Sequence, residues 1–234
     1  MIAFDMTLRE TLSQMDISFD DDMITRSAEY AAYLLDENQK MNLTAIVDEQ
    51  AVAVKHFADS LAILKYCELS RGASLVDIGS GAGFPGMVLK IFRPDLKITL
   101  IDSLKKRCYF LERLAREIGI EDVPVVWGRA EEMGRKEEMR ECFDFAAARA
   151  VASLPILLEY TVPFVKPGGK ILAMKAKEEE SDPQNALTAL NCVVDEVVRY
   201  DLKGETRALF IIGKEGKLDD KYPRRPGMPE KRPL

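Results

Sequence analysis

A glycine-rich segment that directly follows a short apolar run constrains the fold of this chain more than any other feature. Residues 74–78 (SLVDI) run into residues 79–86 (GSGAGFPG). Glycines at such a turn permit positive φ and let backbone amides approach a ligand. Amides at the start of a following helix favour electron-rich ligand groups. Pro85 suits the first helical position, because it has no N–H to leave unpaired. The segment predicts a strand, a ligand-binding loop and a helix in succession.

Apolar runs alternate with helical patterns along most of the chain. The runs cover residues 74–78, 96–101, 123–127, 143–148 and 170–174, and the helical stretches between them cover 85–92, 103–118, 130–139 and 154–165. Such alternation predicts crossover units and a parallel sheet with both faces covered. Two further runs, 197–202 and 207–213, flank a short link and predict a terminal antiparallel hairpin. We expect an α/β, Rossmann-like fold with a mostly parallel seven-stranded sheet.

The two ends of the chain follow other patterns. Residues 20–36 and 48–66 place apolar side chains at helical spacing, so residues 1–70 predict an N-terminal helical cap on a domain of residues 71–234. The tail, residues 221–234, holds four prolines and five basic residues against one acidic residue. It predicts neither helix nor strand.

Composition excludes several classes of protein. Hydrophobic residues make up 47% and charged residues 31%, as in a soluble globular chain. The four cysteines form no CxxC pair and the chain has one His, so we expect no metal site. No signal peptide is visible and no apolar run approaches the ~18–20 residues of a membrane span, so we expect a cytoplasmic protein. The net charge of −6 weakly opposes a nucleic-acid partner.

The glycine segment can be read in two frames. Residues 81–86 fit GxGxxG, the dinucleotide fingerprint. The other frame places Asp77 two residues before a series of Gly79, Gly81 and Gly83. A carboxylate beside a pyrophosphate would repel it, whereas a sulfonium amino acid would be attracted. The local charge therefore favours S-adenosylmethionine (SAM) over a dinucleotide, with the three glycines as candidate contacts.

Three later segments reach the same predicted edge of the sheet. Asp102 ends the second run, where it can accept hydrogen bonds from ribose hydroxyls or cap the next helix. Residues 128–132 follow the third run and can meet an adenine edge, or can simply start a helix with acidic residues. Arg149 ends the fourth run, where it can contact a cofactor or an RNA phosphate, or form a structural ion pair.

Taken together, the chain resembles the RsmG (GidB, glucose-inhibited division protein B) family of 16S rRNA guanine-N7 methyltransferases. The resemblance covers roughly residues 38–234 and is carried by residues 42–44 (NLT), 55–61 (KHFADSL), 77–86, 100–111, 128–132, 148–150 and 222–229. It implies a class I methyltransferase fold, SAM as cofactor and 16S rRNA or the small ribosomal subunit as partner. It also implies cofactor contacts at Gly79, Phe84, Ala130, Glu131 and Arg149.

The implied reaction requires no general base, because guanine N7 carries an in-plane lone pair and no proton. We therefore assign no catalytic residue and expect His56 to be structural. The alternatives that remain open are an NAD(P)-dependent oxidoreductase, a non-catalytic RNA-binding ribosome-assembly factor and a small-molecule methyltransferase. We expect a monomer.

Local basic groups have to overcome the acidic net charge if RNA is the substrate. Lys105, Lys106 and Arg107 cluster at the start of a predicted helix. Arg224 and Arg225 lie in the tail, where they either contact phosphate or hold the tail on the domain.

Overall fold

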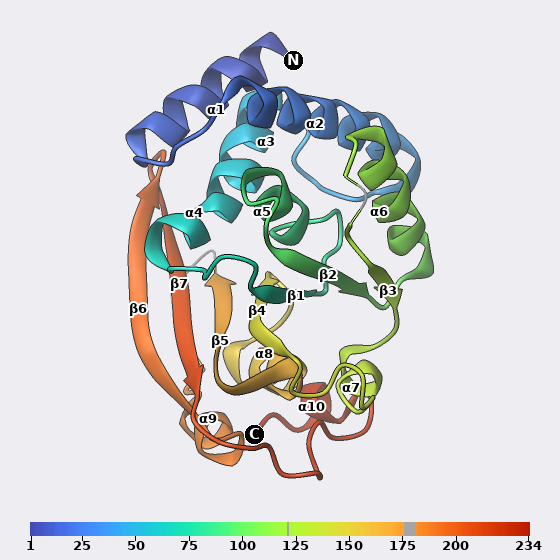
Figure 1. The fold of residues 1–234 in the computed structure, drawn as a ribbon, viewed down its shortest axis with the longest axis vertical. Helices are drawn as coiled ribbons and strands as arrows, with labels where there is room; N and C mark the ends of the chain where they lie inside the picture. The colour runs from blue at the N-terminus through green and yellow to red at the C-terminus, as the bar shows by residue number, and fades with distance from the viewer. Residues whose placement is uncertain (121, 176–180) are drawn as a thin grey trace.

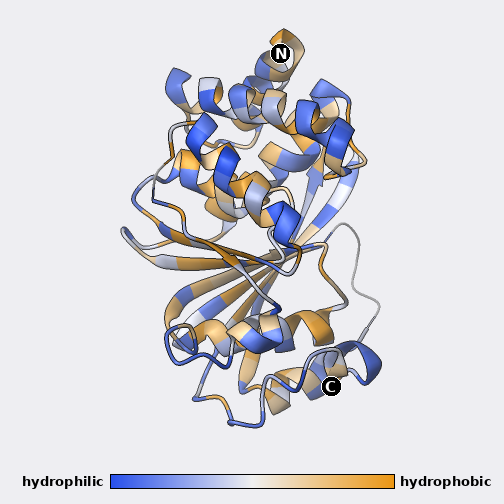
Figure 2. Ribbon diagram, turned by 90° about the vertical axis from the view of Figure 1, so that its right-hand side faces the viewer, coloured by the Kyte–Doolittle hydropathy of each residue, from blue (hydrophilic) through white to orange (hydrophobic). Residues whose placement is uncertain are grey.

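The described strands form one seven-stranded sheet. It is the middle layer of the molecule, as Figures 1 and 2 show. The computed structural model describes residues 1–120, 122–175 and 181–234. The strand order is β3-β2-β1-β4-β5-β7-β6, with β1 to β5 parallel and β7 antiparallel to both β5 and β6. This confirms the predicted α/β fold with its terminal hairpin. The strands are β1 (Ser74–Ile78), β2 (Lys97–Asp102), β3 (Val125–Trp127), β4 (Phe143–Arg149), β5 (Val165–Lys175), β6 (Cys192–Leu202) and β7 (Glu205–Lys214).

The order of the strands reverses next to β1, which pairs with β2 on one side and with β4 on the other. In open α/β sheets, ligands bind at such a switch point, outside the carboxyl ends of the strands. The loop after β1, Asp102 at the end of β2 and Arg149 at the end of β4 therefore share one edge of the sheet.

Helices cover both faces of the sheet, as the Rossmann-like prediction requires (Figure 1). One layer contains α1 (Ile2–Gln14), α2 (Asp21–Met41), α3 (Glu49–Val52), the π-helical η1 (Ala53–Ala58), α4 (Asp59–Tyr66), α5 (Gly86–Phe92) and α6 (Lys105–Glu117). The other contains α7 (Ala130–Met133), α8 (Leu154–Thr161), the 3-10 helix η2 (Val162–Phe164), α9 (Gln184–Ala189) and α10 (Met228–Lys231). Among the described residues, no helix is both long enough and apolar enough to cross a membrane.

Three local predictions are corrected by the structure. Pro85 precedes α5 rather than forming its first residue. Helix α7 ends at Met133 instead of continuing to residue 139, because Gly134, a poor helix former, packs against Pro163 there. The tail contains one helical turn, α10, which starts after Gly227 at φ +76° and has a proline in its first turn.

Alternation along β1 decides which side chains face which helical layer. Leu75 belongs to the cluster that packs the N-terminal helices onto one face of the sheet, together with Phe4 and Phe57. Val76 and Ile78 belong to the cluster on the opposite face. The side chain of Asp77 therefore points to the layer that holds α5 and the N-terminal helices.

Candidate functional site

The loop between β1 and α5 has the backbone conformation that its glycines predict. Gly79, Gly81 and Gly83 have φ values of +72°, +58° and +102°. A Cβ at Gly79 would lie 2.9 Å from Val151 Cγ2, and one at Gly83 would lie 2.5 Å from Tyr30 Oη. At Gly81 the nearest such atom is 3.8 Å away, so Gly81 borders open space that a ligand can fill.

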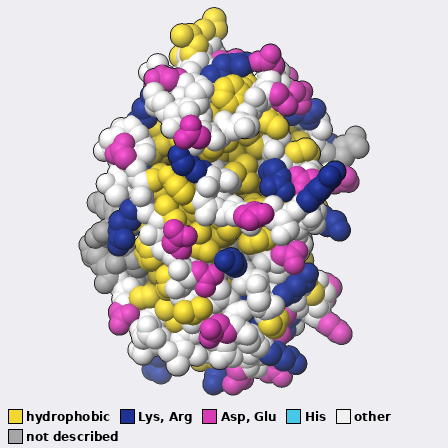
Figure 3. Space-filling model, turned by 60° about the vertical axis from the view of Figure 1, so that its left-hand side comes forward, with side chains coloured by type: hydrophobic (Ala, Val, Ile, Leu, Met, Phe, Trp, Pro, Cys, Tyr) yellow, Lys and Arg dark blue, Asp and Glu magenta, His cyan; other side chains and the backbone are white. Residues whose placement is uncertain are grey.

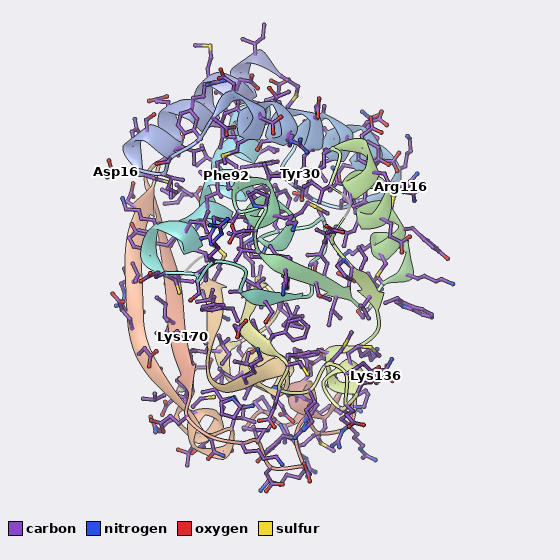
Figure 4. All side chains as sticks on the ribbon, in the orientation of Figure 1. Asp16, Tyr30, Phe92, Arg116, Lys136 and Lys170 are labelled. Atoms are coloured by element: carbon purple, nitrogen blue, oxygen red, sulfur yellow. The ribbon has the colours of Figure 1, made fainter. Side chains whose placement is uncertain are left out.

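Hydrogen bonds hold this loop in place without any ligand. The N–H groups of Gly79 and Ser80 donate to Ile101 O at 2.9 and 3.1 Å. Tyr30 of α2, labelled in Figure 4, donates its hydroxyl to Ala82 O at 2.5 Å. A loop fixed from both sides binds its ligand at low cost in conformational entropy.

Asp77 is a buried carboxylate with one unsatisfied oxygen. It is fully buried; its Oδ2 accepts the Gly86 N–H at 2.9 Å, and its Oδ1 has no hydrogen-bond partner among the described residues. Burial raises the pKa of Asp77 to about 7, although the Gly86 N–H and the Arg149 charge act to lower it. An uncompensated buried carboxylate favours a nearby cation.

Asp102 lies just before α6 but is not its N-cap, which is Leu104, so the predicted capping role is wrong and the ribose contact stays a prediction. Its Oδ2 accepts the Gly81 N–H at 2.9 Å and its Oδ1 accepts the Leu104 N–H at 2.8 Å, just before α6. Arg107 Nη1 lies 3.6 Å from Oδ2. The carboxylate is thus oriented by the loop and by α6, and each oxygen retains a lone pair for a hydroxyl donor.

A cavity of about 150 Å³ opens at the carboxyl ends of β1, β2 and β3. Its lining includes four of the predicted contacts, Gly79, Asp102, Ala130 and Glu131, and also Gly128, Val151, Tyr160 and Glu230. Gly81, Gly83, Phe84 and Arg149 are not among its lining residues. Three larger hollows, of about 380 to 460 Å³, lie elsewhere, and two of them border the amino ends of strands, where open α/β sheets do not bind ligands.

The C-terminal tail forms one wall of this cavity. Glu131 is buried, and its Oε1 accepts the Gly227 N–H at 2.9 Å. Tyr160 in α8 donates its hydroxyl to Glu230 Oε1 at 3.1 Å. Tyr160 and Glu230 were not predicted, because no motif or periodicity distinguishes them from ordinary helix residues.

Arg149 joins the end of β4 to the N-terminal helices. Its Nη1 donates to Lys55 O at 3.0 Å and lies 3.2 Å from Asp59 Oδ2. Its guanidinium carbon lies 4.9 Å from the centre of the Phe84 ring. The structure therefore places Arg149 against Phe84 of the loop. The contact of Arg149 with Asp59 is the structural ion pair that was one of the predicted alternatives.

His56 is held within the same cluster. Its Nε2 lies 2.8 Å from Thr44 Oγ1, and its ring stacks on Phe84 with centroids 4.6 Å apart. Burial and the nearby Arg149 charge lower the pKa of His56 to about 3. The imidazole is neutral near pH 7, and its contacts fit the structural role that we expected.

The predicted basic residues of α6 lie beside the cavity rather than in it. Lys105 Nζ lies 5.1 Å from the Trp127 ring centre and 5.6 Å from that of Tyr109. Lys106 Nζ lies 3.5 Å from Met41 O, whereas Arg107 turns toward Asp102. On the side of the molecule shown in Figure 3, positive and negative side chains are interspersed and neither forms a continuous field.

The two tail arginines differ in their surroundings. Arg224 makes a bidentate pair with Glu159, with its Nη2 2.6 Å from Oε2 and its Nε 2.9 Å from Oε1, and its backbone N–H also donates to Oε1. We call this pair the latch, because it holds the tail on α8. Arg225 is exposed.

Within the described parts of the chain, no group of three His, Cys, Asp or Glu side chains could hold a metal ion.

Comparisons with known proteins identify the family and the fold. A family model described as "GidB: rRNA small subunit methyltransferase G" matches residues 23–209. The chain is 44% identical to the Ribosomal RNA small subunit methyltransferase G of Alkaliphilus metalliredigens, over 98% of each chain, and 46% identical to that of Caldanaerobacter subterraneus subsp. tengcongensis, over 88% of this chain and 87% of the relative. A solved SAM dependent methyltransferase from Aquifex aeolicus matches the fold with a TM-score of 0.53 at 18% identity, over 76% of this chain and 97% of that one.

Proposed function

This chain belongs to the GidB family, rRNA small subunit methyltransferase G, and we propose from this premise how its residues serve that activity. The activity is SAM-dependent methylation of guanine N7 in 16S rRNA. The oxidoreductase and non-catalytic alternatives are not favoured.

The unsatisfied carboxylate oxygen of Asp77 is the observation that carries this proposal. It lies behind a glycine loop whose backbone is already fixed, so a cationic ligand on the loop relieves the cost of burying it. A dinucleotide pyrophosphate at the same place would increase that cost. The residues present therefore fit a sulfonium amino acid.

We assign the adenosine part of SAM to the cavity and the methionine part to the loop. The cavity's 150 Å³ is smaller than the ~300–1,000 Å³ typical of sites that enclose a whole ligand. Its lining residues suit the adenosine part, with Asp102 beside the ribose and Ala130 and Glu131 beside the base. Gly79, Gly81, Gly83 and Phe84 then border the amino-acid part, and Arg149 orients Phe84.

The remaining task of the protein is positioning. Bound SAM supplies an electrophilic methyl carbon on a positively charged sulfur. Guanine N7 has a free lone pair, so the chain needs to move no proton and only has to align the reacting atoms at ~3–3.5 Å. The neutral, buried His56 is consistent with this absence of acid–base work.

We also propose the finer features of the assembly. Residues 1–70 serve as a helical cap on a methyltransferase domain of residues 71–234, supported by the Tyr30 hydrogen bond to the loop. The enzyme acts as a cytoplasmic monomer on 16S rRNA or the small subunit. Of the basic groups, Lys105, Lys106 and Arg225 offer charge to RNA phosphates, while Arg224 is occupied by Glu159.

Two measurements test this function. S-adenosylhomocysteine should raise the melting temperature of the protein, and NAD(P)H should not. Small-subunit rRNA from a strain that lacks this protein should have lost one N7-methylguanosine, which the purified protein and SAM restore. Full modification of that guanine in the deletion strain would refute the proposed activity.

A further inference from the structure

A cluster of exposed aromatic and basic side chains lies beside the candidate cavity. Trp127, the only tryptophan of the chain, is 57% exposed, and Tyr109 is 53% exposed. Lys105 Nζ lies within 5.1 and 5.6 Å of their ring centres. Leu104, 44% exposed, precedes them at the start of α6. We call Lys105, Tyr109 and Trp127 the aromatic platform.

The platform is fixed to the edge of the cavity. Trp127 Nε1 donates to Ser103 O at 3.1 Å, which restricts the orientation of the indole. Ser103 and Gly128, the next residue after Trp127, both line the cavity. Trp127 is also the register partner of Asp102 in the neighbouring strand. Figure 1 shows β3 at the edge of the sheet, next to α6.

These features match the chemistry of unpaired nucleotides. Bases of single-stranded RNA stack on exposed aromatic rings, and a nearby lysine adds attraction for the phosphate. Exposing large rings to water is unfavourable unless a ligand covers them. A cationic group between two rings would also disfavour a purely apolar protein partner.

We propose that the aromatic platform stacks an unpaired base of the rRNA substrate, next to the base that is methylated. This inference rests on the proposed function. The end of β4, where Arg149 and Phe84 meet, lies three strands away from β3, or roughly 14 Å at ~4.8 Å per strand. The stacked base is therefore a neighbour of the target guanine rather than the target, and the platform sets the path of the RNA across the cofactor.

Variants of the platform separate stacking from a structural role. Trp127→Ala should weaken binding of a 16S rRNA transcript roughly tenfold, because a stacked base contributes about that much. Trp127→Phe keeps an aromatic face and should retain most of the affinity. Val193→Ala removes an exposed apolar side chain from β6, far from the cavity, and should leave binding unchanged. All variants should bind S-adenosylhomocysteine as the wild type does.

Fluorescence gives an independent readout because Trp127 is the only tryptophan. Adding the 16S rRNA transcript should quench its emission, and Lys105→Ala should shift the titration midpoint to higher RNA concentration. Unchanged RNA affinity in Trp127→Ala would overturn the proposed stacking. Equal losses of RNA binding and S-adenosylhomocysteine binding in both Trp127 variants would also overturn it. Failure of the wild type to methylate 16S rRNA would instead refute the proposed function itself.

Discussion

The guanidinium of Arg224 lies against the carboxylate of Glu159, with its Nη2 2.6 Å from Oε2. Glu159 is fully buried in α8, whereas Arg225, the next residue of the tail, is exposed. Two adjacent arginines therefore have different surroundings, and the proposed RNA contact belongs to only one of them.

Arg224→Ala should destabilise the protein by about 2–4 kcal/mol, because it leaves the buried Glu159 carboxylate unpaired. Breaking a fully buried ion pair costs ~3–5 kcal/mol, and the partial exposure of Arg224 lowers this value. Urea unfolding measures this loss. The double variant Arg224→Ala/Glu159→Gln should regain part of it. A stability change within ~0.5 kcal/mol for Arg224→Ala would contradict the latch.

Arg225→Ala should leave stability nearly unchanged and make the salt dependence of RNA binding shallower by about 0.7–0.9 for one lost phosphate contact. The measurement is the slope of log affinity against log salt concentration. Arg224→Ala, compared at a temperature where it remains folded, is the matched control and should keep the wild-type slope. An unchanged slope for Arg225→Ala would show that Arg225 makes no phosphate contact.

Gly81→Val should abolish SAM binding in a folded protein, since its Cβ would enter the open space beside the loop. Gly72→Val is the matched control, because Gly72 has a similar positive φ of +73° and a Cβ there would meet no atom within 4 Å. Both variants should lose about 1–3 kcal/mol of stability through backbone strain. Calorimetry should then find normal SAM affinity only in Gly72→Val; retained affinity in both would exclude the loop as the cofactor site.

Asp77→Asn should change how stability depends on pH. The folded-state pKa of Asp77, about 7, exceeds its ordinary value of 3.8, so the folded protein binds more protons than the unfolded chain between these values. The wild-type free energy of unfolding should therefore fall, relative to the variant, as pH rises from about 4 to 7. Unfolding at pH 5, 6, 7 and 8 tests this; a constant difference between the two proteins would contradict it.

A bound cation should offset the free-energy cost of burying the ionised Asp77 carboxylate. SAM carries a positive sulfur, so its stabilisation of the wild type should be larger at pH 8 than at pH 6, where Asp77 is mostly protonated. The pH dependence should be weaker with S-adenosylhomocysteine, which lacks the sulfonium charge, and absent in Asp77→Asn. Equal stabilisation at both pH values would argue against Asp77 as the partner of the cationic cofactor.

His56→Ala should retain the single-turnover methylation rate within roughly tenfold, less than the ~10²–10⁴-fold that general-base catalysis contributes. With a pKa near 3, the imidazole stays neutral above pH 5, so the rate should show no titration from His56 below pH 7. The same low pKa means that wild-type stability, relative to the variant, falls as pH drops from about 6.5 to 3. A loss above a hundredfold with intact SAM and RNA binding would give His56 a catalytic role.

Much of the fold follows from local patterns, because the strands of a parallel sheet are buried apolar runs that alternate with helices. The glycine series is equally local, and the positive φ values of Gly79, Gly81 and Gly83 confirm that prediction. Errors arose at element ends, such as the early end of α7 at Met133, where packing of Gly134 on Pro163 overrides helix propensity.

The site was predictable only where its residues lie at strand ends, in the loop or in the segment that directly follows β3. Tyr160 contacts Glu230, 70 residues later, and Glu131 contacts Gly227, 96 residues later. Such contacts depend on how the tail crosses the sheet edge, and a proline-rich segment has no periodicity that encodes its path. The exposure of Trp127 was hidden for a similar reason, because an aromatic residue in an apolar run resembles a core residue until the edge position of β3 is known.

The contribution of the tail to the cavity wall has a consequence for chains that end early. The sheet is complete once β7 has been translated at Lys214, but Gly227 and Glu230 follow later in the chain. A chain that stops between these points has every strand of the sheet but lacks both one wall of the pocket and the partner of the buried Glu159 carboxylate. Truncation between these two points should therefore remove nucleoside binding and lower stability together, because the same short segment completes the pocket and neutralises a buried charge.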